Sequence, residues 1–210
     1  MNPIKDKLIT MLRLQDGMNC KVHPEWIAQR YEWYRAAWVE CAELLDHQGY
    51  KWWKKQIADR DQVVLEVIDI WHFGLSAMFE ADKSYEQIAE EIVNALDDFS
   101  PEPTTVHQAT EALAQRCLET KRVPVQAFWQ LMHTVDLSFD DLFVIYVGKN
   151  VLNLFRQDHG YKDGSYRKVW DGREDNEHLA EIVAALDHTQ SDFGDALYQA
   201  LLSRYEALPA

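Results

Sequence analysis

Two pairs of acidic residues lie in stretches of the chain that otherwise read as apolar helices. Glu40 and Glu43 form one pair, and Glu66 and Asp69 form the other. Residues three apart share a face of an α-helix, so each pair presents two neighbouring carboxylates. An isolated charge on a buried face is too costly and must be neutralised by a proton, a partner or a metal ion. The two pairs therefore predict two antiparallel helices whose carboxylates face each other.

The apolar surroundings of these pairs matter more than their spacing. With 35 acidic residues in 210, roughly six such pairs arise by chance, and most would lie on solvated faces. On a helical wheel, however, Glu40 lies in an apolar stripe, and the helix around the second pair is apolar on nearly all sides. The stripe contains Trp26, Trp33, Ala37 and Leu44, and the second pair is surrounded by Val64, Ile68, Trp71 and Leu75. Four oxygen ligands favour a hard ion, Mg²⁺ or Mn²⁺, over zinc.

The segment between the pairs is basic and aromatic. It contains Lys51, Trp52, Trp53 and Lys54. A nucleoside triphosphate is strongly anionic, and four carboxylates repel it unless divalent cations intervene. The lysines can bind phosphate oxygens, and either tryptophan offers a face on which a base can stack. A surface turn with one packed tryptophan is the alternative interpretation.

A second candidate for anion binding lies late in the chain. Lys149, Asn153 and Arg156 recur at helical spacing, and a glycine-containing loop with Tyr161 and Lys168 follows. This is the most basic part of an acidic chain, which favours anion capture by a loop that orders when ligand binds. A solvated basic loop is the alternative.

Almost every segment reads as helical, which predicts a single all-α domain. Core helices are expected at about 3–16, 24–47, 60–81 and 139–156, smaller inserted helices at about 84–137, and a loop with closing helices at 157–207. Ser84 with Gln87 predicts a capping box at the start of one inserted helix.

Composition excludes several classes of partner. The formal charge of −14 argues against binding to nucleic acid or to an anionic membrane, because both would repel the chain. Three cysteines without a C-x-x-C motif give no disulfide framework and no zinc signature, which favours a reduced intracellular compartment. No apolar run approaches the roughly 20 residues of a membrane span. We therefore expect a cytoplasmic protein.

These motifs resemble the all-α dimeric dUTPases of the MazG-type NTP pyrophosphohydrolase superfamily. The two acidic pairs have 22 residues between them, including K-W-W-K, and the four-acid pattern is common to the superfamily. Two segments narrow the resemblance to dUTPases: LQDGMNCKVHPEW near the start, and KNVLNLFRQDHGYKDGSYRKVWDGREDN late in the chain. The resemblance covers most of the chain, although residues 84–138 match only in helical character.

The resemblance implies roles for the residues of these motifs. Glu40, Glu66 and Asp69 would hold Mg²⁺, for which Mn²⁺ can substitute, and Glu43 would orient and deprotonate the attacking water or bind metal itself. The residues expected to contact uracil or deoxyribose are Gln15, Asn19, Trp52, Trp53 and Asn153. Those expected to bind phosphate are Lys51, Lys54, Lys149, Arg156, Tyr161 and Lys168.

The resemblance also implies a fold and an activity. It implies a helical bundle of the all-α NTP pyrophosphohydrolase type, assembled as a homodimer. The reaction would convert dUTP to dUMP and pyrophosphate, with dUDP as a possible second substrate, which limits uracil in DNA. The amides of Gln15, Asn19 and Asn153 can pair with the edge of uracil, whereas cytosine presents an amino group there and leaves partners unpaired.

Three alternatives stay open at the level of sequence. Within the enzyme class, a MazG-like or dCTPase-like relative would act on other nucleotides. A carboxylate-bridged di-iron or di-manganese bundle would use Asp69-x-x-His72 as a ligand pair, but a second acid-x-x-His is needed and no good candidate is present. A helical scaffold without enzymatic activity would not be stabilised by nucleotide.

Overall fold

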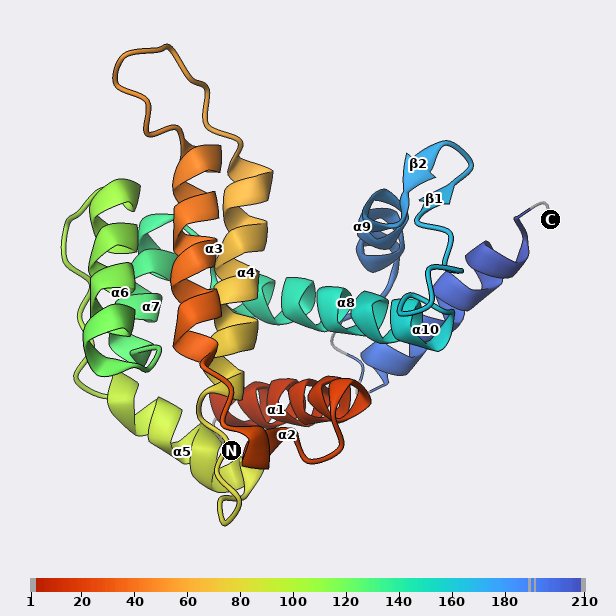
Figure 1. Cartoon of the computed structure of the whole chain (residues 1–210), viewed down its shortest axis with the longest axis horizontal. Helices are drawn as coiled ribbons and strands as arrows, with labels where there is room; N and C mark the ends of the chain where they lie inside the picture. The colour runs from red at the N-terminus through yellow and green to blue at the C-terminus, as the bar shows by residue number, and fades with distance from the viewer. Residues whose placement is uncertain (1–2, 189, 191, 209–210) are drawn as a thin grey trace.

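The computed structural model describes residues 3–188, 190 and 192–208. These residues form ten α-helices and one short β-hairpin, which confirms the predicted all-α bundle (Figure 1). The elements are α1 (Pro3–Val22), α2 (Trp26–Gln29), α3 (Trp33–Gln48), α4 (Arg60–Ser76), α5 (Tyr85–Leu96), α6 (Val106–Thr120), α7 (Val125–Thr134), α8 (Phe139–Asp158), β1 (Val169–Trp170), β2 (Arg173–Glu174), α9 (Asp175–Ala185) and α10 (Phe193–Glu206).

The antiparallel pair α3 and α4 stands at the centre of the bundle (Figure 1). Asp59 caps α4, because its side chain accepts a hydrogen bond from the Gln62 backbone N–H at 3.2 Å. Besides α3, helices α1, α7 and α8 pack against α4. A helix covered on so many sides must be apolar nearly all round, which is the pattern of its sequence.

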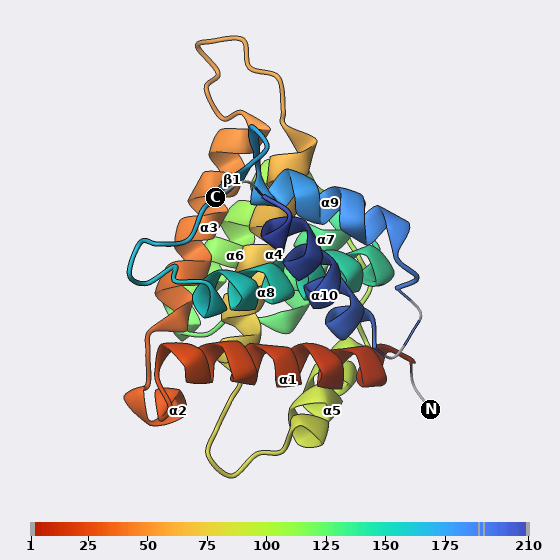
Figure 2. The same ribbon diagram turned by 90° about the vertical axis from the view of Figure 1, so that its right-hand side faces the viewer.

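Helix α8 connects two hydrophobic cores. Leu142 and Tyr146, in its first half, belong to the larger core, which α1 and α3 to α7 complete. Val151 and Phe155, in its second half, belong to a smaller core with the hairpin, α9 and α10, where Trp170 is fully buried. Figure 2 shows α1 running alongside α8, so the long first helix supports the connection.

Three predicted helix boundaries were wrong. Helix α1 continues to Val22 rather than ending near residue 16, because Asn19 is buried and its amide donates to Ser76 Oγ of α4 at 3.0 Å. The helix predicted at 24–47 is two helices, since Arg30 adopts a left-handed conformation with φ 51°. No Gly or Pro marks that break in the sequence. The helix predicted at 60–81 ends at Ser76.

Because residues 24–47 form two helices, the apolar stripe predicted around Glu40 is partly wrong. Trp26 lies on α2, so it is not part of the α3 stripe, whereas Ala37 and Leu44 are buried on α3 as expected. The predicted capping box at Ser84 is confirmed at the start of α5.

The late loop contains a hairpin that the sequence interpretation missed. Val169 pairs with Glu174 and Trp170 with Arg173. Asp171 and Gly172 both have positive φ, 47° and 78°, which is the conformation that Asp-Gly favours in two-residue hairpins. None of the described helices is long and apolar enough to span a membrane.

A buried ion pair links α9, which belongs to the smaller core, to α8. Arg156 donates two hydrogen bonds of 2.8 Å to the Asp175 carboxylate, and Tyr166 donates a third of 2.8 Å. The side chain of Asp175 is 0% exposed and that of Arg156 is 14% exposed. Burial alone would raise the pKa of Asp175, but the hydrogen bonds and charge of Arg156 hold that pKa below its usual value. The carboxylate therefore stays ionised.

Asp175→Ala should lower the free energy of unfolding by about 3–5 kcal/mol, because it leaves the Arg156 guanidinium buried without its partner. Denaturant unfolding measures this loss. Glu32→Ala, which removes the exposed pair with Arg35, is the control and should cost less than about 1 kcal/mol. Because the folded pKa of Asp175 is lowered, its contribution is present above the unfolded pKa of about 3.9 and is lost as pH falls further. Equal losses in the two variants would contradict this account.

Candidate active site

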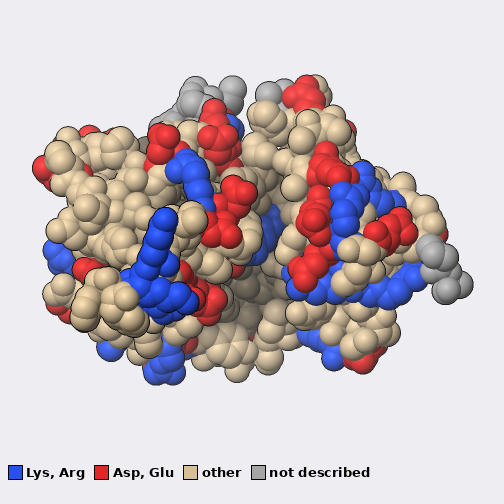
Figure 3. Space-filling view, turned by 90° about the horizontal axis from the view of Figure 1, so that it is seen from above, with Lys and Arg blue, Asp and Glu red and all other residues tan. Residues whose placement is uncertain are grey.

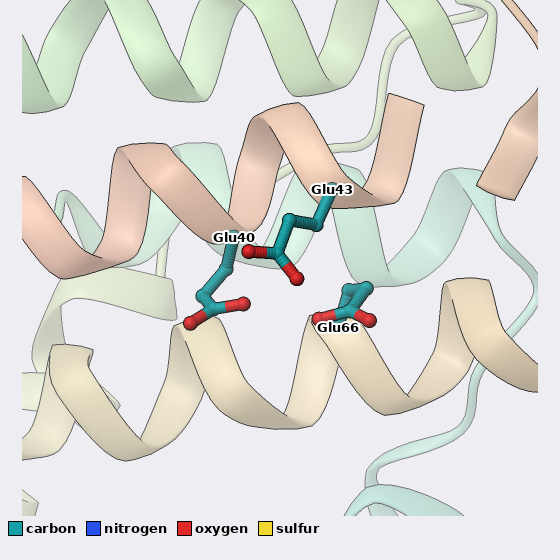
Figure 4. A group of neighbouring side chains, drawn as sticks. All are labelled: Glu40, Glu43 and Glu66. Carbon is teal, nitrogen blue, oxygen red and sulfur yellow. The ribbon is translucent and has the colours of Figure 1, made fainter. Parts of the chain in front are cut away.

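Three carboxylates meet between α3 and α4. Glu40 and Glu43 project from α3 and Glu66 projects from α4, and Figure 4 shows the three side chains pointing toward one another across the helix pair. One ligand oxygen of each lies within 4.8 Å of the others. Glu66 is buried, Glu40 is partly buried and Glu43 is exposed. The predicted facing of the two acidic pairs is therefore observed for these three residues.

Burial and the charges of neighbouring carboxylates raise the pKa of Glu40 and of Glu66. Burial is the largest cause for Glu40, whose pKa rises to about 8, and a carboxyl–carboxyl hydrogen bond with Glu66 and the charges of Asp69 and Glu43 add to it. The pKa of Glu66 is also raised, chiefly by burial. Like charges held close together in a partly buried place disfavour ionisation. The site therefore favours bound positive charge.

Asp69, the fourth predicted metal ligand, binds a lysine in this structure. Its carboxylate forms an ion pair with Lys149 of α8. Burial raises the pKa of Asp69, and the Lys149 ammonium opposes that rise. Lys149, a predicted phosphate ligand, thus lies beside Asp69, a predicted metal ligand that follows Glu66 by about one helical turn. His47 also approaches, with its Nε2 atom 3.4 Å from the Glu66 carboxylate.

A cavity of about 580 Å³ lies between α4, α8 and α9, and Lys149 is part of its wall. Val64, Ile145 and Leu179 give it an apolar lining. Figure 3 shows the molecular surface hollowed between the side that carries α3 and α4 and the side that carries the hairpin and α9, with acidic residues along the rims.

The predicted base-reading residues of α1 lie in a buried hydrogen-bond network. Gln15 Oε1 lies 2.6 Å from the Tyr146 hydroxyl and 2.8 Å from His72 Nδ1. Gln15 Nε2 lies 3.1 Å from Asn19 Oδ1, and Asn19 Nδ2 lies 3.0 Å from Ser76 Oγ. His72 also stacks on Tyr146, with ring centroids 4.0 Å apart. The network therefore joins α1, α4 and α8.

Two buried polar atoms next to this network have no hydrogen-bond partner among the described residues: His72 Nε2 and Asn150 Nδ2. Asn150 follows Tyr146 by one turn of α8, and it is 2% exposed. Burial lowers the pKa of His72 to about 3, so its ring is neutral. Unpartnered buried polar atoms are costly and rare, so a bound molecule that pairs with them would be stabilised.

The aromatic segment between α3 and α4 projects beyond the ends of both helices (Figure 1). Trp52 is 89% exposed and Trp53 is 60% exposed, and the ring contacts of this pair among the described residues are with each other and with Tyr50. Lys51 forms an ion pair with Asp46. The structure does not bring these predicted ligands to the carboxylates.

The late predicted ligands lie along α8 and the loop after it. Asn153 accepts a hydrogen bond of 3.2 Å from Arg156, whose other donors bind Asp175. Tyr161 and Lys168 are exposed, and Lys168 pairs with Glu174 at 3.1 Å. Of this group, only Lys149 contacts one of the four predicted metal ligands.

Sequence reasoning missed the roles of His72, Ser76 and Tyr146 in this network and the buried position of Asn150 beside Tyr146 on α8. The signal was present as polar residues at helical spacing within apolar helices: His72 and Ser76 follow Asp69 on α4, and Tyr146 and Asn150 flank Lys149 on α8. The alternative di-metal bundle predicts His72 as a metal ligand beside Asp69. In the structure its Nδ1 atom forms a hydrogen bond with Gln15. Among the described residues, the side chains whose ligand atoms lie close enough to share a metal ion are Glu40, Glu43 and Glu66.

A comparison with protein families identifies the chain. The model of a family described as dUTPase matches residues 7–161 of the 210 residues. The match includes both acidic pairs, Gln15, Asn19 and all of α8, whereas Lys168, the hairpin, α9 and α10 lie outside it. A search of curated proteins finds no significant match. The chain belongs to the all-α dUTPase family and is a dUTP diphosphatase.

Proposed function

We propose that this enzyme hydrolyses dUTP to dUMP and pyrophosphate in a Mg²⁺-dependent reaction, with Glu40, Glu43, Glu66 and Asp69 as the metal site. Mn²⁺ can substitute for Mg²⁺, and dUDP is a second substrate. The observation that carries the proposal is the set of three glutamates between α3 and α4, with oxygens within 4.8 Å of one another.

The donor set fits a hard divalent cation. All its ligand atoms are carboxylate oxygens, which suit Mg²⁺ and Mn²⁺. Burial and the charges of neighbouring carboxylates raise the pKa of Glu40 and of Glu66, and a cation would offset those charges. Asp69 would join the set when Lys149 binds a phosphate oxygen instead. Bound Mg²⁺ would neutralise phosphate charge and polarise the phosphorus that is attacked.

Glu43 is the residue proposed to activate water. It is the exposed carboxylate of the three, whereas Glu40 and Glu66 lie deeper. An exposed carboxylate next to buried ones can receive a water molecule, orient it and take its proton as it attacks. Phosphoryl transfer depends mainly on such positioning and on charge neutralisation.

The base and the phosphates of dUTP are proposed to bind to different sets of residues around the carboxylates. Gln15 and Asn19 each use one N–H in the buried network and keep a second for a uracil carbonyl. Lys149 lies closest to the carboxylates and would bind the phosphates first. The other proposed ligands are Asn153 and Trp52 or Trp53 for the nucleoside, and Lys51, Lys54, Arg156, Tyr161 and Lys168 for phosphate.

We propose a homodimer as the active form. Trp52, Trp53 and Ile57 are 89%, 60% and 86% exposed on the projecting segment. Such apolar exposure is typical of an interaction surface. In a dimer this segment can reach the site of the other subunit, which accounts for its distance from the carboxylates of its own chain.

A panel of deoxynucleoside triphosphates tests the activity. With Mg²⁺, dUTP should release pyrophosphate faster than dCTP, dTTP, dATP or dGTP by at least about a hundredfold, because unpaired polar groups penalise the wrong base. EDTA should stop the reaction, and Mn²⁺ should restore it. Preference for another nucleotide would replace dUTP as substrate, and full activity in EDTA would exclude the metal site.

Glu43→Gln should lower kcat for dUTP by about 10²–10⁴-fold, since a glutamine cannot accept the proton of the attacking water. Pyrophosphate release under saturating dUTP measures the loss, and circular dichroism checks the fold. Glu111→Gln makes the same change at an exposed position of α6 and should leave kcat unchanged. Normal turnover by Glu43→Gln would remove this residue from catalysis.

A further inference from the structure

The hydrogen bonds of the buried network around Gln15 can run in either of two directions, because an amide or an imidazole ring can exchange its donor and acceptor positions. In the first, the Ser76 hydroxyl donates to the His72 carbonyl oxygen, which is 2.9 Å away, and accepts from the Asn19 amide. Asn19 Oδ1 then accepts from Gln15 Nε2, so Gln15 Oε1 must face Tyr146 and His72. A carbonyl oxygen only accepts, and His72 must therefore carry its proton on Nδ1.

The second direction reverses both amides. Ser76 would donate to Asn19 Oδ1, Asn19 would donate to Gln15 Oε1, and the Gln15 amide N–H groups would point at Tyr146 and His72. His72 Nδ1 would then be an acceptor, and its proton would move to Nε2. Asn19, Gln15 and His72 keep the same number of hydrogen bonds in both directions, whereas Ser76 forms two in the first and one in the second.

Tyr146 distinguishes the two directions. Its side chain is 0% exposed, and within the part of the chain that the structure describes its hydroxyl donates to Gln15 Oε1, at 2.6 Å. Reversal would replace that acceptor with an N–H group and leave a buried hydroxyl proton without a partner, which is costly. Burial raises the pKa of Tyr146 well above 10, so the hydroxyl keeps its proton. The hydroxyl thus selects the first direction.

The direction of the network decides whether the free ring nitrogen of His72, Nε2, can accept or donate a hydrogen bond. In the first direction the unpartnered His72 Nε2 carries a lone pair and can only accept. Uracil offers the matching pattern, a donor at N3–H beside carbonyl acceptors. Cytosine offers an acceptor at N3, which would place two lone pairs against each other at His72 Nε2.

We propose that Tyr146 is a positioning residue for base selection: through Gln15 it fixes His72 as an acceptor, and the enzyme thereby prefers uracil to cytosine. The proposal rests on the proposed function, because it assumes that the base of dUTP lies against this network. Tyr146 itself does not contact the base in this account.

Tyr146→Phe tests the proposal, since it removes the hydroxyl and keeps the ring that stacks on His72. The ratio of kcat/KM for dUTP to that for dCTP should fall by about tenfold or more, because either direction is then allowed. Tyr198→Phe, which removes a hydroxyl that donates to Asp158, is the control and should keep the wild-type ratio. An unchanged ratio in Tyr146→Phe would overturn the proposal.

The tautomer of His72 gives a second readout that needs no turnover. Long-range ¹H–¹⁵N spectra of the wild-type protein should show the His72 proton on Nδ1, and Tyr146→Phe should show the Nε2 tautomer or a mixture. A wild-type proton on Nε2 would overturn the proposal even if the variant does not fold. Wild-type protein that releases no pyrophosphate from dUTP would instead contradict the proposed function, and the spectra would still decide the direction of the network.

Discussion

The crowding of carboxyl groups in a partly buried place between α3 and α4 is the constraint on which the rest of the structure depends. Glu40 and Glu66 lie close together in a partly buried place, where their pKa values are raised. Apolar packing keeps the helices together around these acidic groups. Ala37 and Leu44 of α3 and Val63, Val67 and Ile70 of α4 are buried in the same core. The helix pair is therefore stable enough to present charges that would otherwise separate.

The chemistry and the base recognition are connected through α4 and α8. Polar residues recur every three or four positions on each helix, at Glu66, Asp69, His72 and Ser76 on α4 and at Tyr146, Lys149 and Asn153 on α8. The two stripes meet where Asp69 pairs with Lys149 and where His72 stacks on Tyr146. The carboxylates and the amides of α1 are therefore held by one rigid arrangement, which suits a reaction that depends on positioning.

Sequence reasoning reached the parts of the fold that depend on local patterns. The all-α class follows from helical periodicity, the start of α5 from the Ser84 capping box, and the facing of Glu40 and Glu43 toward Glu66 from acidic pairs in apolar helices. It failed where distant contacts decide the outcome. Asn19 extends α1 through its bond to Ser76, and Arg30 breaks the predicted helix without a local signal.

The same limit applies to the site. Spacing on one helix indicates which residues share a face, but it does not indicate which helix will lie opposite. The pairing of Asp69 with Lys149 and of Gln15 with Tyr146 joins residues far apart in the chain. The exposed position of Trp52 is equally invisible in the sequence, because a tryptophan is usually expected to be covered.

Thermal unfolding with and without Mg²⁺ tests the central claim, that the carboxylates between α3 and α4 are stabilised by a divalent cation. At a Mg²⁺ concentration about a hundred times Kd, the wild-type Tm should rise by about 5–10 °C relative to EDTA. Glu66→Gln should lose most of that rise, and in EDTA it should melt at or above the wild type because one repelling charge is gone. A wild-type Tm that does not respond to Mg²⁺ or Mn²⁺, or an equal response in the variant, would contradict the account.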